Sequence, residues 1–141
     1  MSKTKSAVLI VLASAVSFFL TPLFWPNPMT GIHPTSGQLP FFILMSVIES
    51  VSFGIGVWFV WEGRKVLSAQ ASASKSLINW TYLAICWMLL SWWPHDNLHK
   101  INGENLQGLI CIEYGFHLTL IISAVIIANF FLRTLRPKQQ L

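Results

Sequence analysis

Five side chains that bind metal ions or protons in many proteins lie between Trp92 and His117, within an otherwise apolar sequence. They are His95, Asp96, His99, Glu113 and His117. His95 and His99 are four residues apart, as are Glu113 and His117, and four residues make about one helical turn. If both segments are helical, each pair therefore shares one helix face.

Neutral imidazoles combined with carboxylates suit Cu, Zn, Fe or Mn, whereas calcium requires more oxygen ligands. The segment HDNLH lacks the glutamate of the HExxH zinc-protease motif, which disfavours protease chemistry. The ExxxH pair is one residue longer than the ExxH motif of di-iron bundles. Neither pair is specific alone, but together they favour a transition-metal site, with the identity of the ion left open. The candidate ligands or supporting groups are His95, Asp96, His99, Glu113, His117 and Glu49.

Glu49 is the one carboxylate within the apolar stretch that precedes Glu62. It lies about ten residues into the expected span 40–62, which corresponds to roughly 15 Å along a helix. An ionised carboxylate facing lipid at such a depth is costly, and intramembrane ionisable groups are by default functional candidates. We therefore expect Glu49 to point into the bundle, to carry a proton or to have a partner, and to approach Glu113 and His117.

A second hypothesis is a membrane-embedded enzyme that acts on a lipid, an isoprenoid, a sterol or a quinone. Its catalytic candidates are Glu49, Glu113 and His117, since burial raises a carboxyl pKa and lowers an imidazole pKa, which makes an acid and a base near neutrality. The candidate pocket walls are Trp87, Trp92, Tyr114 and Phe116.

A third hypothesis is structural, in which the protein is an accessory subunit of a membrane complex. In that case the residues 95–99 form a hydrated turn at the membrane surface. Glu49 and His117 then form a hydrogen-bonded pair that fixes helix register, and such a pair contributes about 0.6–2 kcal/mol.

The composition predicts a membrane protein. The 141 residues are 54% hydrophobic and only 10% charged, with a mean hydropathy of +0.60, whereas soluble domains are about a quarter charged. The net charge of +4 is dispersed rather than gathered into a basic patch, so nucleic-acid binding is not supported. Cys86 and Cys111 lie in apolar stretches without CxxC spacing, which indicates neither a disulfide framework nor a thiolate zinc site.

The order of apolar and polar stretches predicts one all-α domain, an integral membrane bundle of four transmembrane helices. Proline-rich or polar connections separate the helices, and Pro94 either ends the third span or opens a short new helix. The expected spans are 6–25, 40–62, 77–93 and 106–132, and the connections between them are 26–39, 63–76 and 94–105.

The distribution of Lys and Arg predicts the orientation of these spans, because basic residues accumulate in loops that stay in the cytoplasm. With both termini inside, the cytoplasmic segments hold every basic residue except Lys100. We expect a bacterial or archaeal cytoplasmic membrane with N-in and C-in topology and a His/carboxylate site that opens outward. A homo-oligomer and a larger membrane complex are equally compatible with the apolar faces.

Overall fold

The computed structural model describes residues 1–24, 35–70, 73–102 and 106–135. All of the regular secondary structure in these ranges is helical, in agreement with the expected all-α class. The α-helices are α1 (Lys3–Leu20), α2 (Leu39–Gln70), α3 (Lys75–Leu90), α4 (Trp92–Asn102) and α5 (Ile110–Leu135). Short 3-10 helices, η1 (Thr21–Phe24) and η2 (Leu106–Leu109), follow α1 and precede α5.

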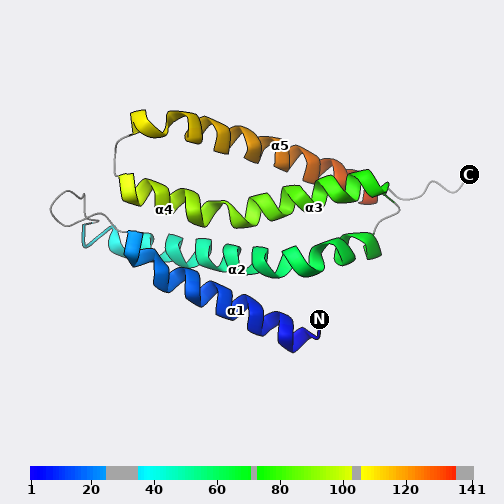
Figure 1. Ribbon diagram of the computed structural model, residues 1–141, viewed down its shortest axis with the longest axis horizontal. Helices are drawn as coiled ribbons and strands as arrows, with labels where there is room; N and C mark the ends of the chain where they lie inside the picture. The colour runs from blue at the N-terminus through cyan, green and yellow to red at the C-terminus, as the bar shows by residue number, and fades with distance from the viewer. Residues whose placement is uncertain (25–34, 71–72, 103–105, 136–141) are drawn as a thin grey trace, which may run out of the picture.

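The helices form a row in which α1 packs on α2, α2 on α3, and α3 on α5 (Figure 1). Helix α4 continues roughly in line with α3 and also packs on α2. The N-terminus and the end of α5 lie toward one end of the molecule, and the end of α4 and the start of α5 lie at the other end (Figure 1).

Serine hydroxyls begin two of these helices. Ser2 accepts a hydrogen bond from the backbone N–H of Lys5, and Ser74 accepts one from Leu77, so each serine satisfies one of the free N–H groups of a first helical turn. Pro40 lies in the first turn of α2, where its missing N–H has no intrahelical partner to lose.

The break between α3 and α4 falls at Ser91 and follows from Pro94. Proline has no N–H, and its ring collides with the carbonyl group four residues earlier, which here belongs to Leu90. The neighbouring backbone hydrogen bonds persist, since the backbone N–H of His95 donates to the carbonyl oxygen of Ser91 at 3.1 Å. The sequence left two outcomes for Pro94, and the structure shows a new helix that already begins at Trp92.

Helix α2 is longer than the expected span 40–62, because it continues through residues that were predicted to be a loop. Leu67 in this extension is buried with Phe59, Ile78 and Phe130 in an apolar cluster between α2, α3 and α5. Arg64 also donates to the side-chain oxygen of Asn79 on α3 at 2.7 Å. The polar residues of 63–70 therefore belong to a packed helix end, and the connection to α3 is short.

Small polar residues fill much of the contact surface between helices. Ser17, Ser50 and Thr81 are almost completely buried, and small hydroxyl side chains allow close helix packing in membranes. The hydroxyl group of Ser17 donates to the backbone oxygens of its own helix, and the hydroxyl group of Ser52 donates to the carbonyl oxygen of Leu89 on α3.

Three helical segments are long and apolar enough to cross a membrane: Lys3–Leu23, Leu39–Ala69 and Gln107–Thr134. Much of their apolar surface is exposed, including Phe19 on α1, Phe41 on α2 and Leu132 on α5. The predicted span 77–93 is not among them, because α3 has only 16 residues before the break at Ser91. These features are consistent with a membrane protein.

Candidate metal centre

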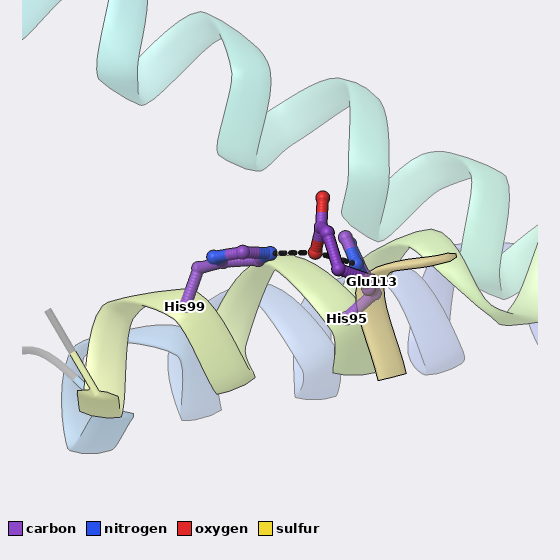
Figure 2. Close-up of side chains that lie close together, drawn as sticks. All are labelled: His95, His99 and Glu113. Carbon is purple, nitrogen blue, oxygen red and sulfur yellow. Dashed lines mark hydrogen bonds and ion pairs between the residues drawn. The ribbon is translucent and has the colours of Figure 1, made fainter. Parts of the chain in front are cut away.

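The carboxylate of Glu113 lies between two imidazoles near the start of α5. The Oε2 atom of Glu113 is 3.0 Å from Nε2 of His95 and 2.7 Å from Nε2 of His99. Both histidines project from α4 toward this one oxygen (Figure 2). One ligand atom from each residue lies within 4.8 Å of the other two, which makes the group a candidate metal centre.

The local helices explain this convergence. His95 and His99 share a face of α4 as their four-residue spacing predicts, and their ring centroids are 4.7 Å apart. Glu113 is in the first turn of α5, and this turn lies beside the two histidines of α4. A carboxylate near a helix N-terminus also interacts favourably with the helix dipole.

An aromatic side chain fixes the orientation of His95. Its ring is stacked on that of Phe116, with the ring centroids 3.6 Å apart and the planes inclined by 9°. Phe116 is buried and also contacts the rings of Trp87 and Trp92. Three of the four aromatic residues considered as pocket walls therefore pack around the imidazole or its neighbour, whereas Tyr114 is exposed.

The contact with Glu113 determines where a neutral His95 ring carries its proton. An ionised carboxylate only accepts hydrogen bonds, so Nε2 of His95 is the donor and Nδ1 keeps the nitrogen lone pair. A metal ion binds the lone pair of an imidazole nitrogen. Metal binding through Nε2 therefore requires the proton to move to Nδ1.

His117 lies at the edge of this group. Its Nδ1 atom is 3.5 Å from Oε1 of Glu113 and 2.8 Å from the backbone oxygen of the same residue. Its side chain is 55% exposed, compared with 11% for His95 and 27% for His99. His117 is thus the most exposed of these three histidines, and it is not one of the three residues whose ligand atoms converge.

The structure brings Asp96 and Glu49 together on another face of α4. Asp96 forms an ion pair with Lys100 one turn later, and Lys100 is 3.8 Å from Oε2 of Glu49 on α2. Glu49 is buried, as expected, but its ion pair is with α4 and not with Glu113 or His117 on α5. The six candidate residues thus fall into two groups beside α4.

Two residues of this region had no role predicted from the sequence. Lys100 is the partner of both carboxylates, and the spacing of Asp96 and Lys100 on one helix is a signal that predicts their ion pair. Trp93 donates from Nε1 to the backbone oxygen of Ser17 and to the hydroxyl of Thr21, and so ties α4 to the end of α1. No pattern in the sequence links residues so distant.

Comparison of the chain with protein-family models, with curated proteins and with solved structures found no match.

Proposed function

We propose that this protein is a small integral membrane protein that binds a transition metal ion through His95, His99 and Glu113. The observation that carries the proposal is the convergence of three ligand atoms from two helices on one point. Two imidazoles and one carboxylate form the donor set of several catalytic zinc sites and of non-haem iron(II) sites. Zinc and iron(II) are therefore the first ions to test.

The present spacing of the three side chains is that of hydrogen bonds. Metal–ligand bonds of about 2.0–2.1 Å at tetrahedral angles separate neighbouring ligand atoms by about 3.3 Å. The observed 2.7 Å and 3.0 Å must therefore widen by only a few tenths of an ångström. The side chains of His99 and Glu113 are partly exposed, so they have room for this movement.

A three-residue donor set leaves coordination positions open. Sites with three protein ligands and an open position bind water or substrate, whereas closed four-ligand sites are structural. The partial exposure of Glu113 and His99 gives an ion access to the site. Handling, delivery or redox use of the metal fits this arrangement better than a purely structural role.

The membrane arrangement belongs to the same proposal. We place α1, α2, the combined segment of α3 and α4, and α5 across the bilayer, with both termini in the cytoplasm. Most of the described basic residues other than Lys100 lie toward the end of the molecule opposite the end of α4 and the start of α5. The positive-inside tendency then puts the metal centre in the outer half. Arg136 and Lys138, which were also predicted to be inside, lie outside the described residues.

Metal titration of the purified protein tests this proposal. The protein in detergent is titrated with Zn²⁺, and with Fe²⁺ under anaerobic conditions, in parallel with Glu113→Gln. Loss of even an indirect support of a metal ligand costs about 10–100-fold in affinity, so we expect the variant to bind at least about tenfold more weakly. Glu62→Gln is the matched control, because Glu62 lies far along α2 from the candidate centre and pairs with Lys65 and the N-terminus. Equal affinity for all three proteins would contradict the proposal.

A further inference from the structure

Helix α4 carries two of the three candidate ligands and is joined to α3 by an interrupted backbone. It has 11 residues and begins after the break at Ser91. Pro94 removes the hydrogen bond that would connect its first turn to the carbonyl group of Leu90. The rotation of α4 about its own axis is therefore not determined by α3 alone. Side chains on the other faces of α4 must help to fix it.

Trp93 anchors the face of α4 that lies opposite the candidate ligands. It precedes His95 by two residues, which corresponds to about 200° around a helix. Its Nε1 atom donates to the backbone oxygen of Ser17 and to the hydroxyl oxygen of Thr21, each at 3.1 Å. Its ring lies against that of Phe53 on α2, with the ring centroids 5.2 Å apart. The indole group therefore contacts both α1 and α2.

The groups around this N–H group are buried and hold one another in place. Ser17 and Thr21 are each only 2% exposed. The hydroxyl group of Thr21 donates to the backbone oxygen of Ser17 at 3.1 Å, which orients its own oxygen to accept from Trp93. Asn97, one turn after Trp93, is also buried and donates from Nδ2 to the backbone oxygen of Trp93 at 2.8 Å. An indole N–H only donates, so its loss leaves these buried oxygens with one donor fewer.

The candidate metal centre tolerates little rotation of α4. A rotation of about 10° moves atoms at the side-chain surface of a helix, about 5–6 Å from its axis, by about 1 Å. Metal and binding sites need their ligands within about 0.5 Å of the working geometry. His95 and His99 move together with α4, whereas Glu113 belongs to α5. Rotation of α4 therefore changes the separation between the two imidazoles and the carboxylate.

We propose that Trp93 is a positioning residue of the metal centre. Its hydrogen bonds to the end of α1 fix the rotation of α4, and thereby the positions of His95 and His99 relative to Glu113. Helix α1, which contributes none of the three converging ligands, then influences how tightly the ion is bound. Coupling of this kind is reciprocal, so a bound ion also stabilises the packing of α4 on α1. The inference rests on the proposed function, because it requires a metal centre.

Titration of Trp93→Phe with Zn²⁺ in detergent tests this inference. Phenylalanine keeps an aromatic ring against Phe53 but has no N–H group. We expect the affinity for Zn²⁺ to fall about two- to tenfold, which is the net effect of one hydrogen bond on an equilibrium constant. Trp58→Phe is the matched control, because the Nε1 atom of Trp58 on α2 is buried and donates no hydrogen bond. Equal affinities of Trp93→Phe and the wild-type protein would overturn the inference.

Thr21→Val provides a second test that leaves the indole group in place. It removes one acceptor and should weaken Zn²⁺ binding about twofold, less than Trp93→Phe, since the backbone oxygen of Ser17 still accepts. The double variant should bind no more weakly than Trp93→Phe alone, because both changes break the same contact. Additive losses would overturn the inference. If Trp93→Phe does not fold, Thr21→Val decides, and an affinity equal to that of the wild-type protein would then contradict the role of this contact.

The absorption spectrum of the protein saturated with Co²⁺ separates positioning from a general loss of stability, because the spectrum of this ion depends on its ligand geometry. We expect a changed spectrum in Trp93→Phe and an unchanged one in Trp58→Phe, even where both variants unfold at a lower temperature. An unchanged spectrum in Trp93→Phe would leave Trp93 a purely structural role and overturn the inference. A wild-type protein that binds neither Zn²⁺ nor Co²⁺ would contradict the proposed function itself.

Discussion

At the residue scale, Glu113 is the side chain on which the candidate metal centre depends. Its Oε2 atom is the common partner of His95 and His99, so it joins α4 to α5 in this group. His95 and His99 are more buried than His117. Their Nε2 atoms point to the Glu113 carboxylate, whereas Nδ1 of His117 lies closest to the backbone oxygen of Glu113. That difference predicts unequal contributions to metal binding.

We expect His99→Ala to weaken metal binding at least about tenfold, because it removes a ligand atom. His117→Ala should change the affinity by less than this, about threefold at most, since His117 is exposed and lies outside the group of three converging ligand atoms. Calorimetric titration of both variants with Zn²⁺ provides the comparison. A larger loss for His117→Ala would place the ion at the outer edge of the group instead.

The sequence could predict the two histidine-containing pairs but not which carboxylate they meet. Helical spacing is a local property, and it correctly placed His95 beside His99 and Glu113 one turn before His117. The meeting of His99 with Glu113 depends on how the chain returns after α4. Likewise, the buried position of Glu49 was predicted from its cost in lipid, but its pairing with a lysine of α4 comes from helix packing.

At the element scale, the close packing of α1 on α2 depends on Gly54. A Cβ atom at this position would lie 2.6 Å from the backbone oxygen of Ile10 and would collide with the hydroxyl group of Ser14. Because one of these neighbours is backbone, rotation of a side chain cannot relieve the overlap. Gly54 therefore sets the distance between the two helices.

Gly54→Ala should destabilise the protein, since α1 and α2 must separate to accommodate the methyl group. Overpacking of this kind costs about 1–3 kcal/mol. Gly115→Ala is the matched control, because a Cβ atom added there would meet nothing within 4 Å and alanine favours helix. Unfolding in mixed micelles with an increasing fraction of SDS measures the stability of both variants. Equal stabilities for the two variants would show that the contact between α1 and α2 tolerates the extra methyl group.

The helix boundaries show where sequence patterns are reliable and where packing overrides them. The cost of Pro94 inside a helix is local, so a boundary near it was predictable. The extension of α2 through 63–70 was not, because its polar composition resembles that of a loop. Burial of Leu67 against α3 and α5 stabilises residues 63–70 as part of the helix.

At the scale of the whole molecule, charge and polarity are separated between the two ends. One end has the basic residues at the start of α1, the end of α2 and the start of α3, and the other has both polar groups of α4 (Figure 1). Between the ends, the exposed helix faces are largely apolar. A lipid bilayer accommodates the basic end and the polar end at its two surfaces and the apolar middle in its hydrocarbon core.

Cysteine labelling in intact cells tests the proposed orientation. In a background with Cys86→Ala and Cys111→Ala, new cysteines are placed at Gln38 and Lys75, which are both exposed. Gln38 precedes α2 and Lys75 begins α3, so the two positions lie at opposite ends of the molecule. A maleimide that does not cross membranes should label Gln38→Cys in intact cells, but Lys75→Cys only after permeabilisation. The reverse pattern would invert the topology and place the metal centre on the cytoplasmic side.

X-ray absorption spectroscopy of the metal-loaded protein tests the central claim most directly. For a bound Zn²⁺ ion, we predict nitrogen and oxygen neighbours at about 2.0–2.1 Å. We also predict outer-shell scattering from two imidazoles, which falls to one in His99→Ala. Sulfur neighbours at about 2.3 Å, or a spectrum without imidazole scattering, would contradict the assignment of His95, His99 and Glu113 as the metal ligands.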